Sequence, residues 1–254
     1  MKIINGKKIA AQILADLKKE IREKKLKPCL AVILVGDDPA SCLYVQKKEQ
    51  AAQKIGIEIR KYNLSKQTSE KKILEIIELL NRDFQINGIL VQLPLPKNIS
   101  ADRIIQAIRP DKDVDGFVKN SIFKSPFVLA VDRALQETGR DLIGKKAVVL
   151  VNFNIFGQSL KSQLKKLKFI KDFKKADIII TALGQPQIIK GEMIKPGAIL
   201  IDGGMSKVDG KTVGDVDRES VKEKAKWLSP VPGGIGPITV AFLLRNVIKD
   251  VPQM

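Results

Sequence analysis

Short apolar runs alternate with helix-forming segments along this chain, and the alternation restricts the fold more than any other feature. The runs CLAVILVG, GILVQL and AVVLV are bounded by turn residues, and the segments between them repeat apolar residues every three or four positions. A strand that is buried on both faces is apolar throughout, and a helix that crosses over a sheet is apolar along one side. The sequence therefore predicts an α/β fold in which helices cover both faces of parallel sheets.

The expected elements form two series that meet near residue 118. The first comprises helices at 7–26, 39–54, 100–109 and after the cap signal Thr68, Ser69, with strands at 29–36, 57–64 and 88–93. The second comprises helices at 128–138, 157–168 and 238–249, with strands at 146–151, 177–181 and 198–202. We expect two α/β domains, one over 1–118 that the last helix (236–254) completes and one over 119–235. Small ligands commonly bind between such domains, so we expect an active-site cleft there.

The absence of histidine and the distribution of charge exclude several kinds of site. Without histidine, Ser-His and Cys-His catalysis and imidazole metal ligation are excluded, so acid/base work falls to lysine, carboxylate, tyrosine or cysteine. The formal charge of +17 would suit nucleic acid, but the lysines are dispersed among glutamates and aromatic residues make up only 5%. Cys29 and Cys42 fit no thiolate metal spacing. We expect no nucleic-acid partner, no metal and two reduced thiols.

Hydropathy predicts a cytoplasmic protein. The chain has no apolar run of about 18 residues, which is the length that a membrane-spanning helix needs. Its first 20 residues form a lysine-rich amphipathic pattern that lacks the apolar core of a secretory signal. We therefore expect no membrane partner.

Two strand ends carry residues that suit acid/base chemistry. VGDDPASCLYVQKKEQAA leads from a strand into a helix in which Tyr44 and Lys48 are four positions apart, so both can face one bound molecule. A solvated lysine beside a packing tyrosine is the alternative. GILVQLPLP places Gln92 at the carboxyl end of a strand, where α/β sheets hold their ligand groups, or where a glutamine merely caps a loop.

Two further stretches lie in turns. PDKDVDGF has three aspartates in five residues, but their spacing does not match a calcium-binding hand, so this is either a metal loop or an acidic turn. PVPGGIGPIT brings three glycines and three prolines to the start of the last helix, near Thr239. Exposed backbone amides there can face a ligand, although a purely structural turn is also possible.

In this order and at these separations, the four stretches resemble the methylenetetrahydrofolate dehydrogenase/cyclohydrolase family. The resemblance extends from INGKKIA near the start, through IDGGMSKVDGKTVGDVD, to the final helix. It implies a Rossmann-like second domain, tetrahydrofolate derivatives as partners and a homodimer. It also implies two reactions. A hydride passes from 5,10-methylenetetrahydrofolate to NADP, and water then opens the methenyl product to 10-formyltetrahydrofolate.

The resemblance assigns roles to residues on the folate side. Lys48 corresponds to the catalytic lysine, and Gln92 to the glutamine that partners it. Such a lysine works only if part of it is neutral, which burial or a neighbouring group must supply. Asp115 corresponds to the carboxylate that hydrogen bonds to the pterin ring, and Tyr44 to the tyrosine that lies against the folate. The loop that closes over the folate corresponds to Gly233, Gly234, Pro237 and Thr239.

The nucleotide side departs from the family in three places. Where relatives carry Gly-Arg-Ser, this chain has Val151, Asn152 and Phe153, which crowd a pyrophosphate and leave no guanidinium for the 2′-phosphate of NADP. Only IKDFKK separates LKKLKF from ADIIIT, so a strand and its His-Ser-x-Thr loop are expected to be missing. FKSPFVLAV replaces a longer connection with a Pro-Cys-Thr-Pro type motif. We expect Val151, Asn152, Phe153 and Met205 to form a degenerate cofactor site.

Three functions are consistent with this pattern. The first is a folate enzyme that keeps the cyclohydrolase step, or folate binding, while its dehydrogenase step is weakened or lost. The second is a divergent enzyme that performs both steps and binds its cofactor differently. The third is a folate-binding or interaction subunit without activity. NADP is the cofactor that the resemblance implies, although the residues that would separate it from NAD are not identifiable.

Overall fold

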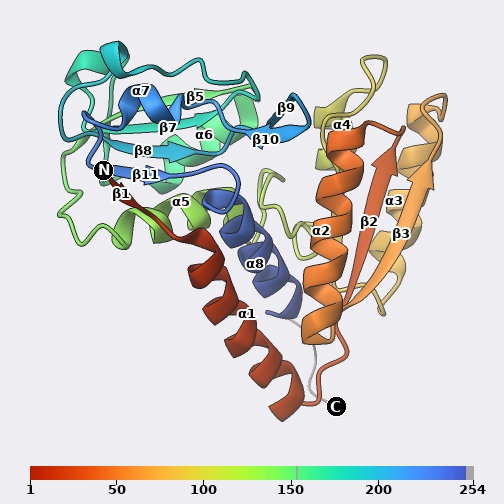
Figure 1. The fold of residues 1–254 in the computed structure, drawn as a ribbon. Coiled ribbons are helices and arrows are strands. Elements are labelled where there is room, and N and C mark those ends of the chain that lie inside the picture. The colour runs from red at the N-terminus through yellow and green to blue at the C-terminus, as the bar shows by residue number, and fades with distance from the viewer. Residues whose placement is uncertain (153, 250–254) are drawn as a thin grey trace. The chain divides into compact units, whose positions relative to one another are not determined.

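The computed structural model describes residues 1–152 and 154–249, and the chain divides into two compact units. Ala11–Pro126 and Val240–Met254 form the first, which we call the three-stranded unit. Met1–Ala10 and Phe127–Thr239 form the second, the six-stranded unit. Both are α/β structures with parallel sheets (Figure 1), which confirms the predicted fold class.

The three-stranded unit has the strand order β3-β2-β4, and neighbouring strands are parallel. The strands are β2 (Cys29–Val35), β3 (Glu58–Leu64) and β4 (Gly88–Val91). The helices are α2 (Pro39–Ile55), α3 (Glu70–Arg82), α4 (Ala101–Gln106) and the greater part of both α1 (Gly6–Glu23) and α8 (Ile235–Ile248). Ser69 caps α3 by accepting a hydrogen bond from the Lys72 amide, as its cap signal predicts.

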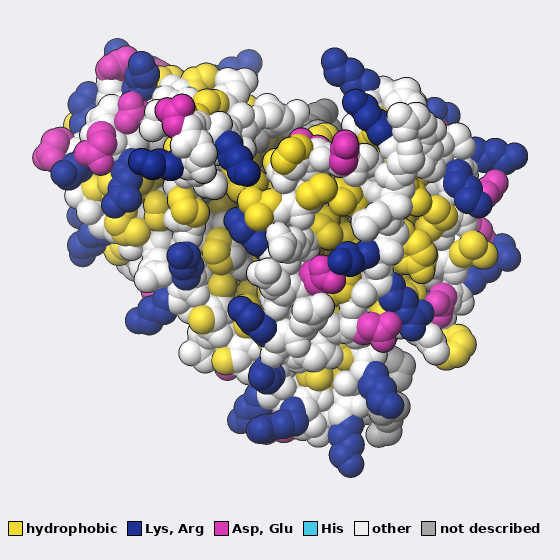
Figure 2. Space-filling view, turned by 45° about the vertical axis from the view of Figure 1, so that its right-hand side comes forward, with side chains coloured by type: hydrophobic (Ala, Val, Ile, Leu, Met, Phe, Trp, Pro, Cys, Tyr) yellow, Lys and Arg dark blue, Asp and Glu magenta, His cyan; other side chains and the backbone are white. Residues whose placement is uncertain are grey.

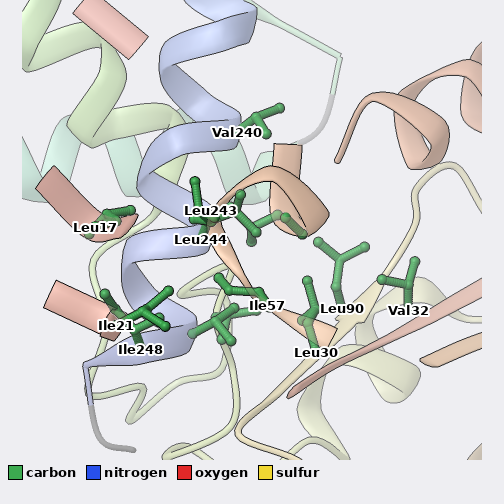
Figure 3. Packing of buried hydrophobic residues seen from close by; sticks show 14 of the residues in the cluster. Leu17, Ile21, Leu30, Val32, Ile57, Leu90, Val240, Leu243, Leu244 and Ile248 are labelled. Atoms are coloured by element: carbon green, nitrogen blue, oxygen red, sulfur yellow. The ribbon is translucent and has the colours of Figure 1, made fainter. Parts of the chain in front are cut away.

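Successive residues of β2 face opposite sides of the sheet, and each side has its own apolar core. Leu30, Val32 and Leu34 pack with α1, α2 and α8, whereas the residues between them pack with α3 and α4. Helices on both faces explain why all seven residues of this strand are apolar and buried. Figure 3 shows the first core, which includes Leu17, Ile21, Leu90, Val240, Leu243, Leu244 and Ile248.

The six-stranded unit has the strand order β1-β11-β8-β7-β5-β6, and its neighbouring strands are also parallel. The strands are β1 (Lys2–Ile3), β5 (Lys146–Val151), β6 (Lys168–Phe169), β7 (Ile178–Ala182), β8 (Ile199–Asp202) and β11 (Trp227–Ser229). Helices α5 (Pro126–Gln136), α6 (Asn154–Gln163) and α7 (Arg218–Val221) accompany them, with short 3₁₀ turns at Phe173–Lys175 and Gly191–Met193. A separate antiparallel hairpin joins β9 (Ser206–Val208) to β10 (Lys211–Val213).

The boundaries of the two units differ from those of the expected domains. Residues 1–10 lie in the six-stranded unit because β1 pairs with β11, whereas the sequence assigned them to the first domain. A strand of two residues has no periodic signal that could have placed it. Residues 119–126 remain with the three-stranded unit, and the last helix belongs to it only from Val240 onward rather than from 236.

The surface carries the dispersed charge that the sequence suggests. Figure 2 shows Lys and Arg side chains spread over the visible face, with Asp and Glu among them. Within the described residues, no helix is long and apolar enough to cross a membrane.

Candidate functional site

The sequence around Lys48 builds a well-defined helix. The Asp38 carboxylate accepts a hydrogen bond from the Ser41 amide, Pro39 begins the first turn, and Gly56 ends α2 in the left-handed conformation. Tyr44 and Lys48 lie one turn apart on this helix, and both are partly buried. A lysine on a helix that is fixed at both ends is a well-placed acid/base group.

Lys48 contacts the strand-end glutamine directly. Its Nζ donates a hydrogen bond of 2.9 Å to Gln92 Oε1. The Gln92 amide donates to the Ile33 carbonyl, which continues the β4 ladder, and Gln92 Nε2 donates to the Leu93 carbonyl at 2.7 Å. The Gln92 side chain therefore has a fixed orientation and presents its oxygen to the lysine. Sequence spacing placed these residues 44 positions apart, and the fold brings them together.

The loop that carries Asp115 is anchored on both sides of this residue. Buried Lys112 donates from Nζ to the Leu80 carbonyl at 2.8 Å and to the Asp83 carbonyl at 2.7 Å, at the end of α3. The Asp113 carboxylate accepts from the Val118 amide at 2.7 Å. Two of the acidic and basic residues of PDKDVDGF thus order the loop, which sequence reasoning did not foresee.

Burial shifts the pKa values of Lys48 and Asp115 in the directions that favour their uncharged forms. Burial lowers the pKa of Lys48 below 10.5, and the charge of Asp115 opposes this shift. Burial raises the pKa of Asp115 to about 6, with Lys48 opposing and Asp113 adding to the increase. Desolvation outweighs the attraction within the pair for both groups. A lysine with a lowered pKa gives up its proton more readily than an exposed lysine, which suits it to acid/base catalysis.

The glycine and proline loop belongs to the six-stranded unit. Gly233 has a φ of +99°, and Thr239 Oγ1 donates to the Ile235 carbonyl at 3.1 Å within α8. The loop packs closely on Gly6, where an added Cβ would lie 1.7 Å from the Gly234 carbonyl oxygen. The Lys7 amide donates to the Gly233 carbonyl at 3.2 Å. The stretch INGKKIA therefore supports this loop, and Pro237 follows in the first turn of α8.

Two of the expected cofactor residues lie at the end of β5. Val151 is its last residue, and the Asn152 amide donates to the Ala182 carbonyl at 3.3 Å while its side chain donates to the Leu183 carbonyl. Phe153 lies outside the described residues. Strand order reverses between β5 and β7, where Rossmann-like sheets hold their dinucleotide. Asn152 thus bridges the two strand ends that border this position.

Within the described chain, no strand lies between LKKLKF and ADIIIT, as the sequence predicts, and the strand that precedes this gap is short. β6 has two residues, and they pair only with Lys146 and Ala147 at the start of β5. Because β6 ends four residues before the level of Val151, it does not reach the carboxyl edge of the sheet. The second strand of a Rossmann-like unit normally presents the group that binds the adenosine ribose at that edge. β6 is therefore too short to present such a group at this edge.

Two buried carboxylates hold the loops that follow β7 and β8. Asp215 accepts from Thr181 Oγ1 at 2.6 Å, from the Leu183 amide at 2.6 Å and from the Gln185 amide at 2.9 Å. Asp202 accepts from the amides of Gly204 at 3.0 Å, Asp215 at 3.1 Å and Val216 at 3.0 Å. These bonds fix the backbone beside Met205. Both carboxylates lie in the stretch IDGGMSKVDGKTVGDVD, but nothing in that stretch indicates this role, since a buried carboxylate has no periodic signal.

Replacement of Asp202 should change how stability depends on pH. Burial raises the pKa of Asp202 to about 7, and Asp215 adds to the increase while the three amides oppose it. Because the folded state then holds a proton that the unfolded state releases, wild-type stability should fall by about 4 kcal/mol between about pH 4 and pH 7. Asp202→Asn should remove this part of the slope in denaturation curves across that range. Asp209→Asn, at the exposed hairpin tip, should keep the wild-type pH dependence. If wild type and both variants lose stability with pH at the same rate, the pH dependence does not come from Asp202.

Within the described residues, no group of three or more Cys, Asp or Glu side chains is arranged to hold a metal ion. Of the aspartates of PDKDVDGF, Asp111 pairs with Arg109 at 2.6 Å and Asp113 accepts from the Val118 amide at 2.7 Å. Cys29 is buried and Cys42 is exposed, and both are free thiols.

Family models match both parts of the chain. The model described as tetrahydrofolate dehydrogenase/cyclohydrolase, catalytic domain, matches residues 4–115, and the NAD(P)-binding domain model of that family matches 127–254. The bifunctional protein FolD of Halothermothrix orenii is 42% identical over 274 residues, which covers 98% of this chain and 97% of that protein. Because the alignment is longer than the 254 residues of this chain, the relative has residues without a counterpart here.

Solved structures of similar proteins extend this likeness to the fold. The crystal structure of the bifunctional FolD methylenetetrahydrofolate dehydrogenase/cyclohydrolase from Campylobacter jejuni has a TM-score of 0.89 at 37% identity, covering 98% of both chains. The Trypanosoma brucei protein, in complex with NADP cofactor and inhibitor, has a TM-score of 0.88 at 29% identity, covering 97% of this chain and 95% of that one.

Proposed function

Because the chain belongs to the tetrahydrofolate dehydrogenase/cyclohydrolase family, we propose that its Lys48 site hydrolyses 5,10-methenyltetrahydrofolate to 10-formyltetrahydrofolate. The hydrogen bond of 2.9 Å between Lys48 Nζ and Gln92 Oε1 carries the proposal. It joins a lysine whose pKa burial lowers to a fixed amide oxygen, beside a carboxylate whose pKa burial raises. Proton transfer near neutral pH needs such a group.

The hydrolysis assigns a task to each side chain. Water adds to the carbon that bridges N5 and N10, and neutral Lys48 accepts a proton as the C–O bond forms. The bond from carbon to N5 then breaks. Of the two protons that water loses, one goes to N5 and the other is released. Gln92 orients the lysine, Asp115 accepts hydrogen bonds from the pterin ring, and Tyr44 lies against the folate.

Loss of methenyltetrahydrofolate absorbance tests this step. The protein should accelerate the decay well above the rate in buffer, in proportion to its concentration. Decay at the buffer rate would reject the cyclohydrolase. In that case, saturable binding of a stable folate would favour a non-enzymatic folate-binding subunit over the enzyme.

We further propose that the dehydrogenase step is weakened or lost. Members of the family have an NAD(P)-binding domain, and residues 127–254 match its model. The side chains at the end of β5 do not fit a dinucleotide phosphate, however, because Val151 is bulky and Asn152 carries no charge. The short β6 also presents no group at the edge where ribose is bound. The alternative is an enzyme that performs both steps.

NADP should bind to this protein about 10- to 100-fold more weakly than to the Trypanosoma brucei protein, whose structure contains NADP, because Asn152 supplies no charged hydrogen bond to the 2′-phosphate. Fluorescence titration of both proteins measures the ratio, and methenyl formation from methylenetetrahydrofolate and NADP measures the reaction. Equal affinities would favour the bifunctional alternative. The double variant Val151→Gly with Asn152→Arg should regain affinity, and an unchanged value would assign the loss to the short β6.

Two further expectations remain proposals: a homodimer, from the family resemblance, and a cytoplasmic location, from the hydropathy of the sequence. A homodimer should elute with a light-scattering mass of twice 28.1 kDa. A cytoplasmic location should appear when a tagged chain is followed by cell fractionation.

A further inference from the structure

A buried asparagine joins the last helix to the loop that carries Asp115. Asn246 lies on the apolar side of α8 between Leu243, Leu244 and Val247, and 4% of its surface is exposed. Figure 3 shows the apolar cluster to which its helix neighbours Leu243 and Leu244 belong. Burial of an amide among apolar groups costs free energy unless the amide is hydrogen bonded. A polar residue at this position therefore calls for an explanation beyond packing.

The Asn246 amide connects two separate backbone segments. Its Nδ2 donates to the Val114 carbonyl at 2.9 Å and to the Lys124 carbonyl at 3.1 Å. Val114 immediately precedes Asp115. Lys124 precedes Ser125, and the backbone from Phe123 to Ser125 packs against Gly116. The Asn246 side chain thus holds two segments: the backbone at Val114, just before Asp115, and residues 123–125, which pack against Gly116.

Gly116 shows how tightly these segments fit. Its φ is +67°, and an added Cβ would lie 2.7 Å from the Ser125 amide nitrogen and 2.8 Å from the Phe123 carbonyl oxygen. Because the loop has no room to move toward residues 123–125, any displacement must separate the two segments. The Asn246 hydrogen bonds oppose that separation.

We propose that Asn246 is a positioning residue, which keeps the Asp115 carboxylate within electrostatic reach of Lys48 by fixing the backbone before Asp115 and the segment that packs on Gly116 after it. The α2 helix that carries Lys48 packs in the same apolar cluster as α8, through Val45, Ala52 and Ile55. Asn246 therefore connects the backbone beside Asp115 to α8, which packs in one core with the helix that carries Lys48. The inference rests on the proposed function only in taking this pair as the catalytic one.

Asn246→Leu tests the inference, because leucine has the same branched shape and number of side-chain heavy atoms but no donors. The pH dependence of Lys48 acylation by trace acetic anhydride, read by tandem mass spectrometry, reports the lysine directly and does not depend on activity. If Asp115 moves away, Lys48 loses the charge that favours its protonated form, so the midpoint should shift by about one unit to lower pH. The hydrolytic kcat/KM should fall by about 10- to 100-fold.

Val247→Ala is the matched control. It removes buried volume from the neighbouring position of α8 and should lower the melting temperature without moving the Lys48 midpoint. If Asn246→Leu does not fold, Asn246→Ser leaves space for a water molecule and should give a smaller shift in the same direction.

The outcomes separate the two proposals. An unchanged Lys48 midpoint in the Asn246 variants overturns the positioning role, whether or not wild-type protein hydrolyses methenyltetrahydrofolate. A shifted midpoint in a protein without hydrolysis upholds the positioning role and rejects the proposed function.

Discussion

Lys48→Met is expected to reduce the acceleration of methenyltetrahydrofolate hydrolysis by about 10²- to 10⁴-fold, the usual contribution of a general acid/base group. Methionine keeps the length of the side chain but cannot accept or return a proton. The measurement is the initial rate of methenyl decay at saturating substrate, corrected for the rate in buffer.

The fold should withstand this substitution. Burial already disfavours the charged lysine, and Gln92 is partly exposed, so its oxygen can bond to water when the lysine is removed. The melting temperature should be unchanged or slightly higher. Lys47→Met removes an exposed neighbouring charge and should leave the rate as it is. A Lys48→Met protein that still hydrolyses the substrate at the wild-type rate would assign the chemistry to another group.

Gly6→Ala is expected to have the largest effect on stability. The new Cβ would overlap the Gly234 carbonyl at 1.7 Å, and a backbone carbonyl can yield only if the whole loop moves. We expect a loss of about 3 kcal/mol in the free energy of unfolding, as for severe overpacking. The hydrolytic KM should rise as well, since the displaced loop contains the proposed folate contacts Gly233 and Gly234. Urea denaturation and substrate titration measure the two effects.

Gly236→Ala is the control for this comparison. Gly6 and Gly236 both lie in the first turn of a helix, but an added Cβ at Gly236 meets open space. Alanine there should change stability by less than about 1 kcal/mol, because the restriction that Pro237 places on the residue before it offsets the better helix propensity of alanine. A large loss at Gly6 and a small change at Gly236 are the expected result, and equal losses would mean that the close approach does not determine the cost.

Features set by neighbouring residues could be predicted from the sequence. The Ser69 cap, the apolar β2 and the spacing of Tyr44 and Lys48 on α2 each depend on a few adjacent positions, and each has the predicted form. The hydrogen bond from Lys48 to Gln92 was expected only from the family resemblance, because no local pattern connects residues on a helix and a distant strand.

Features that join distant segments could not be predicted. Nothing near Gly6 indicates that it packs on Gly234, and nothing near Asn246 indicates that it bonds to Val114 and Lys124. The strand β6 was not predicted, because two residues are too few for a period-two signal. Its pairing with β5 becomes visible only in the folded sheet.

The glycines at the base of the β9–β10 hairpin and the two buried acids constrain one another during evolution. An added Cβ would lie 2.0 Å from Asp215 Oδ1 at Gly204 and 1.9 Å from Asp202 Oδ2 at Gly214, so each glycine is tied to the acid on the opposite side. Homologous chains should therefore keep or change these four positions as a set. The hairpin tip is free of this linkage, because Gly210 faces open space. Insertions there should be tolerated, which makes the tip a suitable place to attach a reporter peptide.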